Sequence, residues 1–245
     1  LSDKRGLRYL KTYNNLKVVE IASSTIFKKS IFKSLISILI IFYSLLRSFI
    51  FLLNNRPNLV FGMGGYSSFP VCLAAKILRV PFIIYENNLI IGKANKYLLP
   101  LADKIFVSNK EVEGISEKYS KKVFEIGNII RKEILNFQIR YDFIQKEKSL
   151  KILILGGSQA AKIFAEKLTA IFKECHEARI SLKIYQQCLP EQNKFLTSFY
   201  ENLNIDYEIF NFTDNILNYF NKINLAITRS GSSMLAELIN AKVPF

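Results

Sequence analysis

The chain has 245 residues, half of them hydrophobic, and carries a formal net charge of +14. This length allows two modest domains, and this hydrophobic share excludes an intrinsically disordered chain. Cys72, Cys175 and Cys188 are too few and too scattered for a disulfide framework or a zinc site, so we expect reduced thiols. His176, the single histidine, falls in a charged helical end, where we expect a solvated side chain and no catalytic role.

The basic charge is concentrated toward the N-terminal end. Residues 1–53 contain nine Lys or Arg and two acids, which accounts for half of the net charge. We expect an irregular basic segment first and then a short strand at 16–21. A basic patch of this kind attracts either a nucleic acid or an anionic membrane surface.

Residues 26–53 are apolar enough to form a membrane-spanning helix. One helical stripe, however, carries polar residues: Ser30, Lys33, Ser34, Ser37, Ser44 and Ser48. This stripe favours an amphipathic helix with one face on the protein and an exposed apolar face, and a true span stays the alternative. The aliphatic block lacks the solvated aromatics and cations that nucleic acids need, so a membrane is the expected partner and a nucleic acid is not.

Beyond residue 57, predicted strands and helices alternate. We expect strands at 59–62, 81–85, 104–108, 123–126, 151–155, 182–186, 207–212 and 225–228. We expect helices at 69–78, 93–99, 160–173, 190–203, 214–221 and 232–240, with a helical connection at 131–150. Alternation of this kind predicts an α/β fold with parallel sheets, whose ligands sit at the carboxyl ends of the strands.

Three of these units have the order strand, Gly-rich turn, helix, which presents backbone N–H groups to a phosphate. They contain Gly62-Met63-Gly64-Gly65-Tyr66, Gly156-Gly157-Ser158-Gln159, and Thr228–Ser233 followed by Glu237. The first differs in spacing from the dinucleotide fingerprint. Taken singly, each also fits a plain structural role: a tight turn, a helix capped by Ser158, or a helix capped by Ser232 or Ser233 with a solvated Glu237.

Taken together and in order, the motifs are specific. GMGGY, ENN with GKANK, GNIIR, ILGGSQ and TRSGSSMLAE resemble the MurG family of bacterial cell-wall glycosyltransferases, within glycosyltransferase family 28, from about residue 31 to 245. The resemblance implies the GT-B architecture, two Rossmann-like doubly wound domains, without a metal or cofactor. It implies an N-terminal acceptor and membrane-associated domain at 1–130, a connection at 131–150 and a UDP-sugar-binding domain at 151–245, with both domains incomplete.

The implied reaction belongs to peptidoglycan synthesis. N-acetylglucosamine moves, with inversion, from UDP-N-acetylglucosamine to the C4 hydroxyl of undecaprenyl-diphosphate-MurNAc-pentapeptide, which converts lipid I into lipid II. The implied location is peripheral, on the cytoplasmic face of the bacterial inner membrane. The implied partners are UDP-N-acetylglucosamine, lipid I, the anionic membrane surface and other cell-wall synthesis proteins.

The resemblance also assigns residues. The donor would be bound by Asn88, Arg131, Ser158, Thr213, Ser232, Ser233, Met234 and Glu237. Among these, Glu237 would hold the ribose hydroxyls, and Thr213 would meet the uracil through its backbone. Gly64, Gly65 and Tyr66 would form the loop that faces the lipid diphosphate, and Leu35, Leu39 and Phe42 would belong to the membrane patch.

Departures from the family pattern bear on catalysis. The family's first glycine loop, with the histidine favoured as general base, would precede Leu1, so no catalytic base is assigned. Tyr85 stands where the family has a second histidine, and Ala160 stands where a glycine follows GGSQ. Both ends look cut, so we expect weak or no turnover from these residues alone. The open alternatives are a homologue that binds UDP or membrane without turnover, and another UDP-sugar enzyme such as a 2-epimerase.

Overall fold

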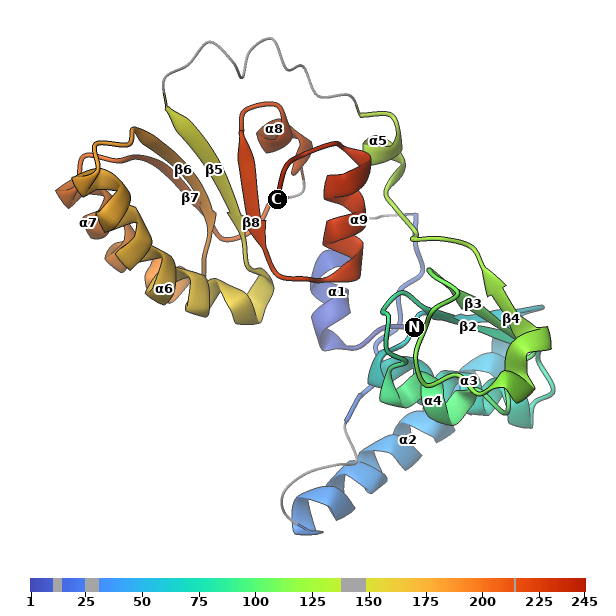
Figure 1. The fold of residues 1–245 in the computed structure, drawn as a ribbon. Coiled ribbons are helices and arrows are strands. Elements are labelled where there is room, and N and C mark those ends of the chain that lie inside the picture. Colours follow the sequence, from blue (N-terminus) through green and yellow to red (C-terminus); the bar gives the residue numbers. More distant parts are fainter. Residues whose placement is uncertain (11–14, 25–30, 138–148, 214) are drawn as a thin grey trace. The chain divides into compact units, whose positions relative to one another are not determined.

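The computed structural model describes residues 1–10, 15–24, 31–137, 149–213 and 215–245. Within these ranges the chain divides into two compact units, Leu1–Asn128 and Ile129–Phe245. Each unit contains a four-stranded sheet in which every pair of neighbouring strands is parallel, with helices packed against it (Figure 1). The α/β class with two Rossmann-like units, predicted from the alternation of strands and helices, is therefore confirmed.

In the first unit the strands lie side by side in the order of the chain. They are β1 (Val60–Gly62), β2 (Phe82–Glu86), β3 (Lys104–Val107) and β4 (Val123–Glu125). The helices are α1 (Lys4–Leu10), α2 (Ile31–Asn55), α3 (Gly65–Ile77) and α4 (Lys93–Leu98), with the 3₁₀ helix η1 (Glu117–Lys122) before β4.

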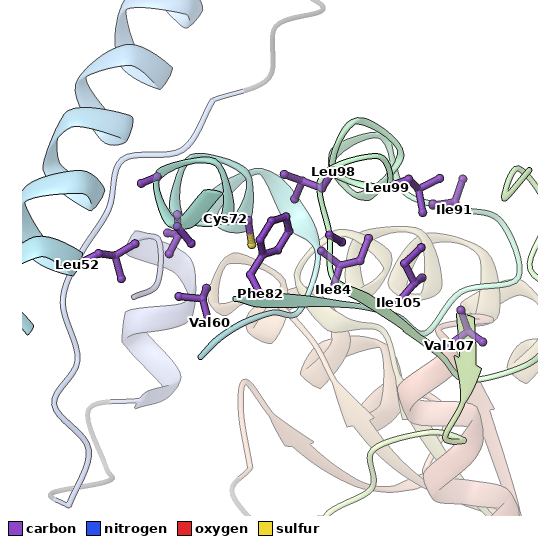
Figure 2. Packing of buried hydrophobic residues seen from close by; sticks show 14 of the residues in the cluster. Leu52, Val60, Cys72, Phe82, Ile84, Ile91, Leu98, Leu99, Ile105 and Val107 are labelled. Atoms are coloured by element: carbon purple, nitrogen blue, oxygen red, sulfur yellow. The ribbon is translucent and has the colours of Figure 1, made fainter. Parts of the chain in front are cut away.

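The core of the first unit lies between its sheet and α3 and α4. Phe82 of β2 lies beside Cys72 of α3, and Ile84 of β2 and Ile105 of β3 lie further along the same core (Figure 2). Alternate residues of a strand share a face, so the residues between them face away from this core. There Phe61, Phe106 and Phe124 form a row of ring contacts across β1, β3 and β4.

In the second unit the strand order is β7-β6-β5-β8. The strands are β5 (Leu150–Leu155), β6 (Leu182–Gln187), β7 (Asp206–Phe210) and β8 (Leu225–Thr228). The helices are α5 (Lys132–Leu135), α6 (Gly157–Glu177), α7 (Asn193–Asn202) after the 3₁₀ turn η3 (Pro190–Gln192), α8 (Leu217–Phe220) and α9 (Ser232–Asn240).

Both faces of this second sheet are buried. Ile152 and Ile154 of β5 pack with Phe172 of α6 and Tyr200 of α7, in one hydrophobic cluster. Leu153 and Leu155, which face the other way, belong to a second cluster with residues of α5, α8 and α9. A strand that is buried on both faces has a continuous apolar sequence, which explains the unbroken Ile152–Leu155 run.

Helix α2 packs through its serine stripe. Ser37, Ser44 and Ser48 are buried. The Ser44 hydroxyl donates to the carbonyl of Ala22 at 2.6 Å, and the Ser24 hydroxyl donates to the hydroxyl oxygen of Ser37 at 3.0 Å. Small polar side chains allow close approach of a neighbouring segment, and their hydroxyls are satisfied locally. Most of the large apolar side chains consequently face outward, as the stripe predicted.

Four helices end in the same way, with a non-glycine residue in the left-handed region. Arg79, Arg179, Asn204 and Lys242 have φ between 49° and 57°. In each, this residue's N–H and the next residue's N–H bond back to carbonyls of the last helical turn, for example Arg79 to Lys76 and Val80 to Ala75. This is the Schellman arrangement, which usually places glycine at that position.

Several local predictions are wrong. Residues 16–21 contribute a single bridge between Ser2 and Glu20 and no strand, because no further strand lies alongside them in the described chain. The first residues are not irregular, since 4–10 form α1. Among the described residues of the connection at 131–150, the helix covers only Lys132–Leu135, since α5 ends at its C-cap Asn136 and Leu150 already belongs to β5. Residues 138–148 of that connection lie outside the described residues.

Candidate functional site

The second unit has a topological switch point at β5. Strand β5 pairs with β6 on one side and with β8 on the other, and Leu155 is in register with Thr228 at their carboxyl ends. The Thr228 hydroxyl donates to the Leu155 carbonyl at 3.1 Å, which joins the two ends. In open parallel sheets the ligand crevice lies outside such a point, because the connections leave it toward opposite faces.

Two helices begin at this edge. Helix α6 starts after Gly156 and α9 starts after Gly231, so both present first-turn N–H groups beyond β5 and β8. These N–H groups lack intrahelical partners and, together with the helix dipole, favour an anion. No heavy atom lies within 4 Å of a Cβ built on Gly231, so this approach is open on the protein side. The arrangement suits a diphosphate.

The serines of this edge are not helix caps. The expected N-cap role of Ser158 is wrong, because α6 begins earlier and Gly156 is its N-cap; Ser158 lies in the first turn, and its side chain lies outside the described part of the structure. The alternative that Ser232 or Ser233 caps α9 is also wrong, because Gly231 holds that position without a side-chain bond. Both serines lie in the first turn of α9.

The two remaining residues of α9 differ in environment. Met234 packs against the cluster that contains Leu153 and Leu238, so its side chain serves the core. Glu237, in the next turn, pairs with Arg131. The Arg131 Nε donates to Oε1 of Glu237 at 2.9 Å, and Nη2 donates to Oε2 at 2.8 Å. The structure thus brings together two residues, 106 positions apart, that the motifs assign to one ligand.

Thr213 follows β7, at the far edge of the same sheet. Its hydroxyl accepts a hydrogen bond from the N–H of Asn215 at 3.2 Å, which orders the turn after the strand. Strand β7 is separated from β5 by β6, so Thr213 lies further along the carboxyl edge than the two helix starts. Its predicted uracil contact therefore stays a prediction.

In the first unit the Gly-rich loop follows β1 directly. Gly64 and Gly65 have φ of 77° and 75°, which favours glycine at both. Helix α3 begins at Gly65, four residues before the predicted start, so Tyr66 lies in its first turn. A Cβ on Gly64 would lie 3.4 Å from Nδ2 of Asn95, so the loop is also held close to α4. Helix α3 thus begins at the carboxyl edge of the first sheet, as α6 and α9 begin at that of the second.

A buried carboxylate, which the sequence reasoning missed, organises the neighbouring loop. Glu86 ends β2 and is 3% exposed. It accepts hydrogen bonds at Oε1 from the N–H (3.1 Å) and Nδ2 (2.8 Å) of Asn88, and at Oε2 from the N–H of Gly92 (2.8 Å) and from Nδ2 of Asn95 (3.0 Å). Asn88 is thus positioned by Glu86. The signal that could have found this is an acid placed directly after an apolar strand and followed by asparagines.

Two other side chains at this edge are buried. The Tyr85 hydroxyl donates to the carbonyl of Gly127 at 3.0 Å. The phenol at the family's histidine position thus connects β2 to the segment after β4. Burial raises the pKa of the Cys72 thiol to about 12, which keeps that thiol neutral. Cys72 lies under β1, where a Cβ on Gly62 would come within 2.7 Å of its sulfur.

Comparisons with known proteins bear on this geometry. Residues 1–107 match the glycosyltransferase family 28 N-terminal domain, and residues 151–245 match the C-terminal domain of that family. The chain is 32% identical over 245 residues to the UDP-N-acetylglucosamine–N-acetylmuramyl-(pentapeptide) pyrophosphoryl-undecaprenol N-acetylglucosamine transferase of Pelagibacter ubique, covering all of this chain and 67% of the relative. It is 35% identical over 204 residues to the protein of the same name from Rickettsia canadensis, covering 82% of this chain and 57% of the relative. The chain therefore spans between about half and two thirds of these relatives.

Solved structures agree on the fold. Acinetobacter baumannii MurG superposes with a TM-score of 0.62 at 23% identity, covering 95% of this chain and 62% of that one. UDP-N-acetylglucosamine 2-epimerase from Rickettsia bellii gives a TM-score of 0.58 at 15% identity, covering 99% and 68%. At these identities the two structures share the fold, and the fold alone does not separate a transferase from an epimerase.

Proposed function

Because the chain belongs to glycosyltransferase family 28, we propose that it acts as an inverting transferase of peptidoglycan synthesis. The donor is UDP-N-acetylglucosamine, and the acceptor is the C4 hydroxyl of undecaprenyl-diphosphate-MurNAc-pentapeptide. The observation that carries this proposal is the carboxyl edge of the second sheet, where α6 and α9 both begin and where Glu237 of α9 pairs with Arg131.

The donor half of the proposal assigns each group a role that its position supports. First-turn N–H groups of α6 and α9, including those of Ser158, Ser232 and Ser233, take the diphosphate. Glu237 accepts hydrogen bonds from the ribose hydroxyls, because an ionised carboxylate is an acceptor and each hydroxyl has one O–H to donate. Thr213 meets the uracil, and Asn88, held by Glu86 in the first unit, contacts the sugar.

The acceptor half rests on the loop Gly64-Gly65-Tyr66 and on α2. Tyr66 lines an apolar hollow together with Ile41 of α2 and Lys93 of α4, so a helix start and a cation border an apolar surface. A lipid diphosphate has the matching chemistry, an anion joined to an apolar chain. The loop is proposed to face that diphosphate, as in the family.

Helix α2 is proposed to attach the protein to an anionic membrane surface. Over Ser34–Asn55 it is long and apolar enough to cross a bilayer. Its serine face, however, is fastened to the rest of the first unit, and Leu52 is buried there. Leu35, Leu39 and Phe42 face outward, with Phe42 64% exposed. A helix that is packed along one side and apolar along the other suits an in-plane position on the cytoplasmic face of the inner membrane.

In the reaction the acceptor C4 oxygen forms a bond to the anomeric carbon while the bond from that carbon to the UDP oxygen breaks. UDP leaves with the electron pair, and the acceptor proton passes to a base, which no described residue is assigned to be. The helix starts offset the charge that develops on the leaving diphosphate. Inversion follows from a single displacement.

The proposal is tested by measuring transfer and binding on the same purified protein. Transfer of labelled N-acetylglucosamine to a lipid I analogue, together with calorimetric binding of UDP, is the expected result. UDP binding without product favours the second candidate, a chain that binds the donor without turnover; the engaged hydroxyl of Tyr85 at the family's histidine position supports that candidate. Formation of UDP-N-acetylmannosamine in the absence of any acceptor would overturn both candidates and identify the activity as that of a 2-epimerase.

Membrane attachment has its own test, flotation with vesicles that contain anionic lipid. Exchange of Leu39 and Phe42 to Gln together removes two exposed apolar side chains, each worth about 1.5–3 kcal/mol when buried, so bound protein should fall at least tenfold. Ile171→Gln is the control, since Ile171 is an apolar side chain 50% exposed on α6 and lies outside the patch. Equal loss in both variants would contradict a role for α2.

A further inference from the structure

The Arg131–Glu237 pair has the geometry of a bidentate ion pair. Two N–H groups of one guanidinium meet the two oxygens of one carboxylate, at 2.9 and 2.8 Å. Bidentate pairs of this kind fix the orientation of the carboxylate as well as its distance. The Arg131 side chain is 43% exposed and that of Glu237 is 12% exposed, so the pair borders solvent and Glu237 is its sheltered member.

The backbone beneath Arg131 is fastened to the helix that carries Glu237. Arg131 precedes α5, and the Ile134 carbonyl of α5 accepts a hydrogen bond from Nδ2 of Asn240 on α9 at 2.8 Å. Ile134 is buried, and the Phe137 ring meets the Phe220 ring edge-on with centroids 5.9 Å apart. Because the chain on both sides of the pair is held in place, ordering the Arg131 side chain costs less than at a free surface.

A carboxylate has about four lone-pair positions, and the guanidinium fork uses one on each oxygen. Each oxygen keeps capacity to accept a further bond. Two hydroxyls on adjacent carbons can use these positions only if the orientation of the carboxylate plane is fixed. A lysine in place of Arg131 would supply the positive charge but would not fix the orientation of the carboxylate plane.

We propose that Arg131 is a positioning residue that acts through Glu237: it holds the carboxylate in the orientation that reads a ribose diol, and so makes the site selective for ribonucleotides. The inference rests on the proposed donor site, because it requires Glu237 to face the ribose. The competing role is a direct grip of Arg131 on the ligand's phosphates.

The two roles differ in which part of the ligand loses affinity. Calorimetry with UDP, 2′-deoxy-UDP and UMP on the whole chain gives two ratios, ribose over deoxyribose and diphosphate over monophosphate. Hydrogen bonds to a charged group predict that the native protein prefers UDP over 2′-deoxy-UDP by roughly tenfold or more. With Arg131→Gln the ribose ratio should collapse to within about threefold of unity, while the diphosphate ratio should change by less than about threefold.

Two further variants sharpen the result. Arg131→Lys should lose most of the ribose ratio although it keeps the charge, and a variant carrying both Arg131→Gln and Glu237→Gln should bind UDP no worse than Glu237→Gln alone. Lys173→Gln is the matched control, because it removes an exposed ion pair with Glu177 in the same unit and should leave both ratios unchanged.

The outcomes separate the inference from its premise. A native protein that does not bind UDP overturns the proposed donor site and this role with it. If the native protein binds UDP but Arg131→Gln leaves the ribose ratio unchanged, the positioning role is overturned and the donor site stands. A lowered diphosphate ratio in Arg131→Gln would contradict the positioning role most strongly. Thermal unfolding of each variant, with native-like secondary structure by circular dichroism, excludes loss of fold as the cause.

Discussion

The carboxyl edges of the two sheets are built differently. At the edge of the first sheet, Glu86 takes four hydrogen bonds from residues at most nine positions away, and Gly62 lies against the buried Cys72. At the edge of the second, Gly231 has no neighbour within 4 Å of a built Cβ, and Glu237 is held by one arginine from 106 positions away. The carboxylate at the first edge is engaged by its own loop. The carboxylate at the second keeps capacity to accept further hydrogen bonds, which suits a ligand with hydroxyl groups.

Glu86→Ala should have the largest effect. It removes the buried acceptor that the N–H groups of Asn88 and Gly92 and the Asn95 amide share, so the free energy of unfolding should fall by about 3 kcal/mol or more. Urea unfolding measures this. The control is Glu111→Gln, an exposed carboxylate near the same loop, with a change below about 0.5 kcal/mol. Similar values for both variants would show that Glu86 does not hold this edge.

Gly62→Ala should come next. Its Cβ would lie 2.7 Å from the Cys72 sulfur, and overpacking of this kind costs about 1–3 kcal/mol of stability. Cys72→Ala in the same chain removes the clashing atom, so the double variant should be less destabilised than the sum of the two single changes. Strict additivity in thermal unfolding would contradict a tightly packed first edge.

Glu237→Ala should act on binding. The pair borders solvent, so the free energy of unfolding should change by at most about 1 kcal/mol, whereas the Kd for UDP should rise roughly tenfold or more. Calorimetry and urea unfolding on one preparation give both numbers. Unchanged UDP affinity would remove Glu237 from the donor site and would make the two edges alike.

Gly231→Ala should have the smallest effect. No protein atom opposes the added methyl group, and φ at Gly231 is −75°, so stability should stay within about 1 kcal/mol of native. A diphosphate approaching the start of α9 would meet the methyl group, so UDP should bind several-fold more weakly. A Gly231→Ala protein that is destabilised but binds UDP with native affinity would show that this position serves stability and not binding, which contradicts the contrast between the two edges.

Sequence reasoning succeeded where the determinants are local. Strand β8 and helix α9 have the predicted bounds, because a short apolar run, a Gly turn and helical periodicity follow one another there. The exposed side of α2 also followed from the sequence, since serines at three- and four-residue spacing mark a face that packs closely.

It failed where the determinants are distant or unusual. Nothing near Arg131 indicates Glu237, because their contact depends on α5 docking against α9. The four bonds to Glu86 depend on the path of its loop, which composition does not specify. The ends of α3, α6 and α7 were predicted only approximately, partly because the usual glycine signal is missing after them.

Those four helix ends have a practical consequence. A side chain in the left-handed region costs about 1 kcal/mol relative to glycine, and here the cost falls on Arg79, Arg179, Asn204 and Lys242. In a parallel α/β unit, a helix that precedes a strand ends at the amino edge of the sheet, the edge remote from ligands. Glycine at these positions would therefore offer an engineer independent gains in thermal tolerance, reached without altering a single group that meets substrate.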